Sequence, residues 1–162
     1  MKIFKDNNGR EWKISITVET IKRVRSLCGV NLLDAIKIEK DGVKADLIDQ
    51  ISNDPVLLVD IIYCICRPQA EEEKISDQQF GESMIGDTVD AATDALLEEL
   101  INFFPEAKKK VLRLVLESAR RLRRQASETV DNLISSGLLQ KNLSQMENDV
   151  SASFTKLPGA SE

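Results

Sequence analysis

The chain begins with two short segments in which apolar and polar residues alternate, as they do in half-buried β-strands. In the second segment, Trp12, Ile14 and Ile16 alternate with polar side chains. An Asn-Gly dipeptide between the segments favours a tight turn, because both residues tolerate positive φ angles. We therefore predict a β-hairpin over residues 2–17. Because two strands alone are only marginally stable, this hairpin is expected to pack against other elements.

After this hairpin, the apolar residues follow the three- and four-residue spacing of helices. Thr17 suits the position that caps a helix and Gly29 suits the position that ends one, so we predict a helix between them. Short helical turns are expected around residues 32–36 and 45–52, with a chain turn at the Asp-Gly dipeptide between them.

A long apolar segment forms the next predicted helix. Asp54 suits its N-cap position, and Pro55 suits its first turn. The segment is apolar nearly all round and is interrupted only by Asp60, which is typical of a helix buried at the centre of a domain. Pro68 is expected to lie just past the end of this helix, because proline cannot donate the backbone hydrogen bond that a helix interior requires.

Three further helices are predicted. Ser76 and Gln79 have the spacing of a capping box, which indicates the start of a short helix. Asp87 is expected to cap a longer helix that ends near Pro105. The helix after this proline is expected to reach about Gln125. Its predicted apolar stripe consists of Val111, Val115, Ala119 and Leu122.

Beyond that helix, the composition shifts to Ser, Asn and Gln with scattered leucines, and Gly137 is expected to interrupt any continued helix. We predict a predominantly α-helical fold with a small N-terminal β-hairpin, arranged as a helical bundle followed by a flexible C-terminal tail. The bundle would be a single globular domain over residues 1–125, made of the hairpin (1–17) and the helices (18–125). Residues 126–162 would form a weakly helical to flexible tail.

Charge is distributed unevenly along the predicted helices. Residues 71–106 contain eleven acidic residues and one lysine, whereas residues 107–125 contain eight basic residues and one glutamate. Within the acidic segment, like charges recur every four residues, which places them on one face of a helix. The candidate partner-binding residues are Asp90, Asp94 and Glu98 in the acidic segment and Lys109, Arg113, Arg120 and Arg124 in the basic segment.

Three interpretations of this charge pattern are open. The two helices can fold into a hairpin in which their charges compensate, or one or both stripes can contact another protein. The basic helix can also contact nucleic acid, but it has no interleaved aromatic residues and its acidic neighbour would repel the phosphates. A net charge of −5 and a pI near 5.0 also argue against general attraction to nucleic acid or to an anionic membrane.

The chain offers little candidate chemistry. It has no histidine, the residue that most often acts as a general base or metal ligand. On a helix, Cys64 and Cys66 would point about 200° apart and could not chelate one ion, so we interpret them as small core residues. No phosphate-binding glycine loop or nucleophile motif occurs, and no apolar segment is long enough to span a membrane. We predict a reduced, cytoplasmic protein that is not an enzyme and has no catalytic residues, cofactor or metal.

A series of helix ends and breaks in residues 60–117 resembles a known family. The residues that carry the resemblance are Tyr63, Cys64, Ile75, Ser76, Phe80, Gly86, Asp87, Leu96, Leu100, Phe103, Phe104 and Pro105. Together they resemble small helical proteins of tailed bacteriophages and prophages, of the tail assembly chaperone type. In that family, a longer frameshifted product can carry a C-terminal extension that recruits subunits of the tail tube.

The resemblance implies a non-enzymatic protein that binds the tape-measure protein while the tail tube forms, with the tail tube protein as a further partner. A chaperone for such a long helical chain is expected to present an apolar groove rimmed with charge and to bind in many copies, so self-association is also expected. Two alternatives remain: a structural component that stays in the particle, and a nucleic-acid-binding regulator that uses the basic helix over residues 108–124.

Overall fold

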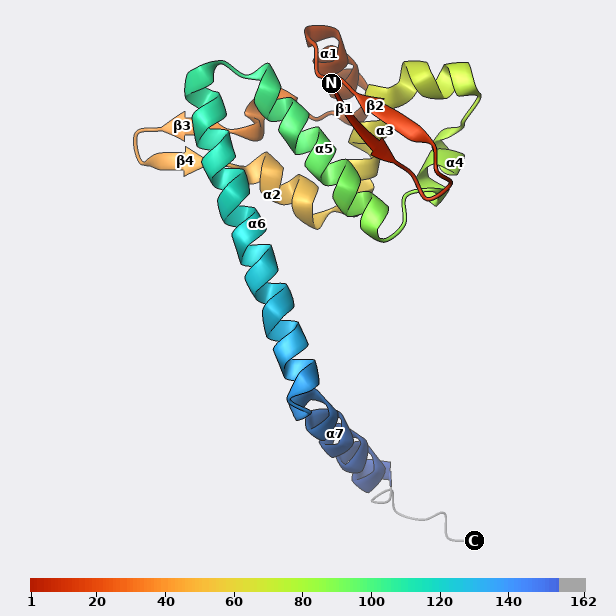
Figure 1. Ribbon diagram of the computed structural model, residues 1–162, viewed down its shortest axis with the longest axis vertical. Coiled ribbons are helices and arrows are strands. Elements are labelled where there is room, and N and C mark those ends of the chain that lie inside the picture. Colours follow the sequence, from red (N-terminus) through yellow and green to blue (C-terminus); the bar gives the residue numbers. More distant parts are fainter. Residues whose placement is uncertain (155–162) are drawn as a thin grey trace, which may run out of the picture. The chain divides into compact units, whose positions relative to one another are not determined.

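The computed structural model describes residues 1–154, and contacts within the chain divide it into two compact units. The first unit covers Met1–Leu116, and the second begins at Glu117. The described residues are mostly helical and include a two-stranded antiparallel hairpin at the N-terminus, which confirms the predicted fold class (Figure 1). Of the weakly helical to flexible tail predicted over residues 126–162, the part up to residue 154 lies mostly in helices, and the last eight residues lie outside the described part of the chain.

Two hairpins, five complete α-helices and one 3₁₀ helix make up most of the first unit. In chain order its elements are β1 (Lys2–Lys5), β2 (Glu11–Ile14), α1 (Val18–Cys28), the 3₁₀ helix η1 (Leu32–Ala35), β3 (Lys37–Glu39), β4 (Gly42–Lys44), α2 (Asp46–Asn53), α3 (Pro55–Glu73), α4 (Asp77–Glu82) and α5 (Asp87–Phe103). The helix α6 (Glu106–Ser135) starts in this unit and continues into the second, which also contains α7 (Leu138–Phe154).

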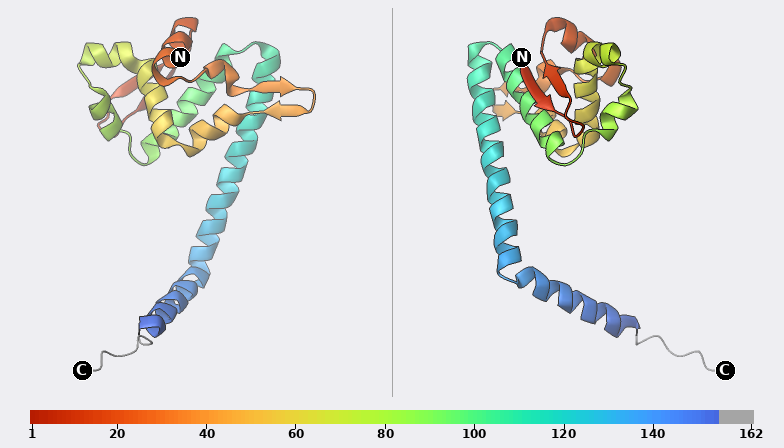
Figure 2. Two further views of the ribbon diagram at one scale, coloured as in Figure 1. Left: turned by 180° about the vertical axis from the view of Figure 1, so that it is seen from behind. Right: turned by 45° about the vertical axis from the view of Figure 1, so that its right-hand side comes forward.

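The N-terminal hairpin lies between two helices. Its strands pair in antiparallel register, with Phe4 opposite Trp12. The first strand, β1, packs along α5, and β2 packs along α3. Trp12 and Ile14 are fully buried, as their alternation with polar residues predicts, and the expected packing of the hairpin on other elements is found. The second hairpin, β3–β4, has exposed residues on both strands and projects from the helices of the first unit (Figure 2).

The central helix α3 is longer than predicted, because Pro68 lies inside it rather than past its end. A proline at this position removes the backbone bond to the carbonyl of Cys64, four residues earlier. The guanidinium of Arg23, on α1, donates to the carbonyl oxygens of Cys64 and Ile65, each at 3.4 Å. A side chain from a neighbouring helix therefore supplies a donor where the proline has none, and α3 continues to Glu73.

The helix starts that follow were predicted with mixed success. The capping box at α4 is present, since the Ser76 hydroxyl accepts from the amide of Gln79 and the Gln79 side chain accepts from the amide of Ser76. The prediction that Asp87 caps α5 is wrong, because Asp87 is the first residue of the helix. Gly86 takes the cap position, with a positive φ of 59°. Glycine adopts such a conformation without the steric penalty that a Cβ would bring.

Helix α6 runs to Ser135, ten residues beyond the predicted end. Gly137 does interrupt the helix, as predicted, with a left-handed φ of 68°. The predicted apolar stripe is only partly right. Within the first unit, the core contacts are made by Leu112 and Leu116, flanked by partly buried valines, whereas Ala119 and Leu122 are exposed.

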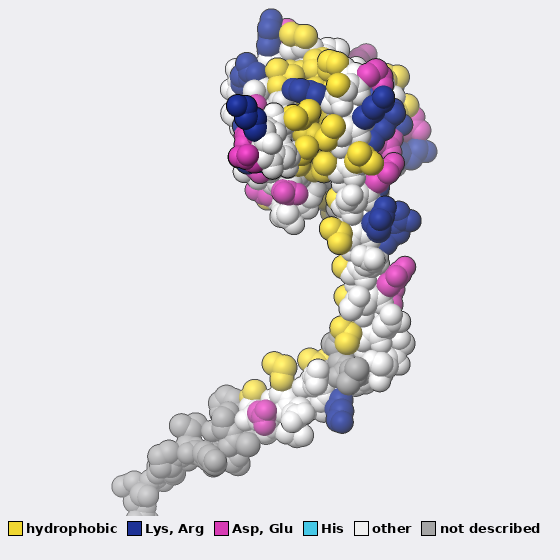
Figure 3. All heavy atoms as spheres, turned by 90° about the vertical axis from the view of Figure 1, so that its left-hand side faces the viewer, with side chains coloured by type: hydrophobic (Ala, Val, Ile, Leu, Met, Phe, Trp, Pro, Cys, Tyr) yellow, Lys and Arg dark blue, Asp and Glu magenta, His cyan; other side chains and the backbone are white. Residues whose placement is uncertain are grey.

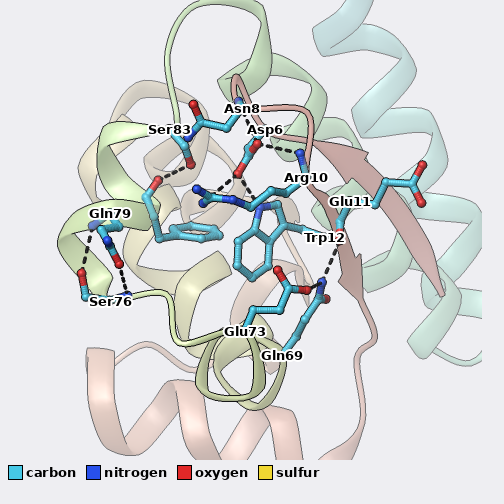
Figure 4. A network of polar contacts seen from close by, with 11 residues as sticks. Asp6, Asn8, Arg10, Glu11, Trp12, Gln69, Glu73, Ser76, Gln79 and Ser83 are labelled. Carbon is cyan, nitrogen blue, oxygen red and sulfur yellow. Dashed lines mark hydrogen bonds and ion pairs between the residues drawn. The ribbon is translucent and has the colours of Figure 1, made fainter.

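A carboxylate in the first turn organises the N-terminal hairpin (Figure 4). The Asp6 carboxylate is buried and accepts hydrogen bonds from the amides of Asn8 and Arg10, each at 2.9 Å, and from the indole nitrogen of Trp12 at 3.0 Å. Trp12 in turn packs edge-on against Phe80 of α4, with ring centroids 4.8 Å apart. The turn is thereby closed, and its aromatic residue is held in the core.

Burial alone would raise the pKa of the Asp6 carboxyl, but the hydrogen bonds from Trp12, Arg10 and Asn8 outweigh it and hold the pKa below the ordinary 3.8. The charged form is therefore favoured by the folded chain. A carboxyl group with a lowered pKa stabilises the fold above its unfolded-state pKa, and this contribution disappears as the pH falls through the folded-state value.

We expect Asp6→Asn to lower the free energy of unfolding by about 1–3 kcal/mol. The amide has the same shape, but in either orientation its NH₂ group would face an N–H donor, either the indole of Trp12 or the backbone amides of Asn8 and Arg10. Urea denaturation followed by Trp12 fluorescence measures the change. Glu11→Gln in the same hairpin is the control and should shift stability by less than about 0.5 kcal/mol, because the Glu11 side chain is exposed. Equal effects would contradict the role of Asp6.

The same pair of proteins tests the lowered pKa. We expect the stability difference between the wild-type chain and Asp6→Asn to be constant near neutral pH and to narrow below about pH 4, where the carboxyl of the unfolded chain begins to be protonated. The contribution is lost as the pH falls further, through the lowered pKa of the folded chain. Denaturation curves at a series of pH values measure this difference. A gap that widens with acidification would show that the pKa is raised instead.

Candidate protein-binding surface

The acidic stripe of α5 faces partly toward the fold. Asp90 is exposed, whereas Asp94 and Glu98 are half-buried. Because α5 packs along β1, the carboxylate of Glu98 reaches the ammonium group of Lys2 at 2.6 Å. The neighbouring Glu99 is buried and pairs with the N-terminal ammonium group at 2.8 Å. At least one member of the predicted stripe, Glu98, therefore has a partner within the first unit.

The basic residues are divided between the two units. Lys109 pairs with Glu106 of its own helix at 2.9 Å, and this pairing lowers the pKa of Glu106. Arg113 is exposed and belongs to the first unit together with Lys109, whereas Arg120 and Arg124 lie in the second. The ion pairs of Glu98 with Lys2 and of Lys109 with Glu106 both lie within the first unit, and neither joins α5 to α6. Charge compensation between the two helices stays a prediction.

The second unit presents an apolar surface that the sequence analysis did not identify. Its exposed large apolar side chains are Leu122, Val130, Leu133, Ile134, Leu143, Met146 and Val150. Figure 3 shows apolar side chains recurring along these helices. The exposed fraction of Leu122 is 66% and that of Ile134 is 61%, so these side chains are largely uncovered within the chain.

The spacing of these residues gives each helix one apolar stripe. Leu122 and Leu133 are eleven residues apart, close to three full turns, so they lie on the same face of α6 with Ala126 between them. On α7, Leu143, Met146 and Val150 follow the same three-and-four spacing. This heptad-like pattern was the available signal. The high content of Ser, Asn and Gln in the same segment favours the prediction of a loose tail instead.

Charge along the second unit changes sign. Residues 117–125 contain four arginines and one glutamate, whereas residues 126–154 contain four acidic residues and one lysine. The α6 stripe is therefore flanked by basic residues at its start and by acidic residues further along, and the α7 stripe lies in the mainly acidic segment. Such an arrangement can orient a helical partner, because an apolar face supplies affinity and flanking charges set direction.

The first unit has hollows on its surface, but they offer little chemistry. A groove of about 560 Å³ runs between β2, α1 and α3, and a smaller one of about 350 Å³ lies between α3, α4 and the start of α5. In the smaller groove, burial and the nearby charges of Asp77 and Asp54 raise the pKa of Asp60. Among the residues the structure describes, no group of three or more cysteine and carboxylate side chains could hold a metal ion.

No helix in the described part of the chain is both long and apolar enough to cross a membrane. The central helix α3 carries Asp60 and several charged residues near its C-terminal end. Its buried residues belong to the core of the first unit.

Two leucines on α6 separate core packing from the exposed surface. We expect Leu112→Ala to destabilise the first unit by about 2–5 kcal/mol, because Leu112 is buried. Leu122→Ala on the same helix should change stability by less than about 0.5 kcal/mol, because Leu122 is exposed. Trp12, the single tryptophan, reports unfolding of the first unit by fluorescence. A large effect of Leu122→Ala would mean that this side chain is covered.

No family model matches the chain, and no curated protein or solved structure matches it either.

Proposed function

We propose that the chain is a non-enzymatic assembly protein that binds a helical partner. The partner is the tape-measure protein of a tailed phage, which the chain binds in the cytoplasm of the host cell while the tail tube forms. The observation that carries the proposal is the pair of exposed apolar stripes on α6 and α7. Contiguous exposed apolar side chains usually mark an interaction site in a protein that must remain in solution.

The chemistry of the stripes fits a long, amphipathic helical partner. Leucine, methionine and valine side chains spaced along a helix can pack into the grooves of another helix. The charge along the second unit changes from basic in residues 117–125 to mainly acidic in residues 126–154, so a partner with the complementary charge order would be held in one direction. A tape-measure protein, which is long and mostly helical, would be kept from aggregating by such contacts.

Co-expression tests this proposal. The wild-type chain should keep a tape-measure protein soluble and co-elute with it on size exclusion. The double variant Leu122→Ser with Leu133→Ser should lose the complex, because both changes fall on one stripe. Leu114→Ser is the matched control, since Leu114 is also largely exposed but lies in the first unit. It should retain the complex.

Two outcomes would reject this function. If the tape-measure protein stays insoluble and no complex forms, the chain is not its chaperone. If the double variant binds as well as the wild type, the apolar stripes are not the binding surface. Mass spectrometry of purified particles separates a chaperone, which should be absent from them, from the alternative of a structural component retained in the particle.

The arginines of the second unit favour one further candidate. All four lie within residues 120–124, and such a cluster of positive charge can contact a phosphate backbone. A nucleic-acid-binding regulator would bind DNA with steep salt dependence, and Arg120→Gln with Arg124→Gln would reduce the slope. Lack of binding at low salt would remove this candidate.

A further inference from the structure

Two thiols from different helices meet in the first unit. Cys28 is the last residue of α1, and Cys64 lies in the middle of α3. Their sulfur atoms are 2.9 Å apart, about 0.9 Å longer than the S–S bond of a disulfide. Both cysteines are free in the structure, so the contact joins two thiols that could be linked by a small closing movement.

The packing of α1 on α3 holds this pair together. Arg23 of α1 donates to the carbonyl of Cys64, and the Cys28 thiol also lies 3.6 Å from the carbonyl oxygen of Asp60 on α3. Gly29 ends α1 with a left-handed φ of 69°, and its amide N–H donates to the carbonyl oxygen of Arg25. This bond fixes the backbone next to Cys28. The two sulfurs thus face each other at a high effective concentration, a condition that favours an intramolecular reaction.

The third cysteine provides a built-in contrast. Cys66 is buried, and its thiol lies 3.7 Å from the carbonyl oxygen of Lys13 in the N-terminal hairpin. Two residues along a helix turn the side chain by about 200°, so Cys66 points away from the side of α3 that meets α1. A reagent that oxidises neighbouring thiols should therefore distinguish Cys66 from the other two.

We propose that Cys28 and Cys64 form an oxidisable pair, which small disulfides of the oxidised-glutathione class convert into a disulfide that links α1 to α3. This inference is independent of the proposed function. It applies to the first unit, whereas the proposed partner surface lies on the second.

The reaction proceeds in two exchange steps. Cys28 is the more exposed of the two, and its thiolate attacks one sulfur of oxidised glutathione and releases the first reduced glutathione. The Cys64 sulfur then attacks the Cys28 sulfur of the mixed disulfide and releases the second. Two protein thiols are oxidised by two electrons, one glutathione disulfide is reduced, and the two thiol protons leave on the two glutathione molecules.

The first step is expected to be slow at neutral pH. Burial, together with the hydrogen bond and charge of Cys64, raises the pKa of Cys28 to about 12, so little thiolate is present. Because the thiolate is the attacking species, the rate of crosslinking should rise about tenfold for each pH unit between pH 7 and 9.

The test uses the full-length wild-type chain. The folded protein is incubated with oxidised glutathione at pH 8, quenched with acid, unfolded and alkylated. Peptide mass spectrometry should find Cys28 joined to Cys64, and Cys66 alkylated. The thermal midpoint of the first unit should rise by about 5–10 °C, because the crosslink closes a loop between distant residues. Reduction with dithiothreitol should reverse both changes.

Matched variants make the result specific. Cys66→Ser should still form the crosslink, whereas Cys28→Ser should not form it. Cys28→Ser alters only a partly exposed side chain, so its fold can be checked by the unchanged fluorescence of Trp12.

Several results would overturn the proposal. Three alkylated cysteines after prolonged oxidation would do so, and so would a stable glutathione adduct on Cys28 that Cys64 never displaces. A disulfide that persists in Cys28→Ser would assign the crosslink to other residues, and a disulfide found only between chains would place the contact outside the fold.

Discussion

The buried carboxylate of Asp6 is the interaction on which the architecture of the first unit depends. It closes the turn of the N-terminal hairpin and accepts the indole N–H of Trp12, so a polar atom of the largest core residue is satisfied without water. The amide of Asn7 in the same turn donates to the carbonyl of Ser83 at the end of α4. The turn of the hairpin is thereby tied to α4, while its strands pack on α5 and α3. A pair of strands that would be marginal alone becomes part of the core.

The central helix shows how a local rule can be offset by a distant residue. Proline inside a helix normally breaks it, because the ring removes a donor and crowds the preceding turn. At Pro68 the missing donor is replaced by the guanidinium of Arg23, and beyond it the Gln69 side chain bonds the backbone of β2 at Glu11 and Lys13. The continuation of α3 is therefore a tertiary effect, which arises only when α1 and the hairpin are already packed against it.

The features that the sequence predicted well are those determined within a few residues. The capping box at Ser76 and the helix break at Gly137 depend on neighbours in the chain, and both are present. The continuation of α3 through Pro68 and the contact between Cys28 and Cys64 require residues far apart in the chain to meet, so spacing could not reveal them. The apolar stripes of the second unit differ from these features, because their periodicity is visible in the sequence. The high content of Ser, Asn and Gln in the same segment favours a loose tail, and this signal conflicts with the periodicity.

The bond between Arg23 and the carbonyl of Cys64 has a consequence for the motions of the first unit. If α1 moved away from α3, the carbonyl of Cys64 would lose a donor that the helix itself cannot replace, because residue 68 is a proline. The end of α1 and the middle of α3 therefore share one opening event, and their amide hydrogens should exchange with solvent as one cooperative segment. A proline that weakens a helix locally thus joins two helices into a single dynamic element.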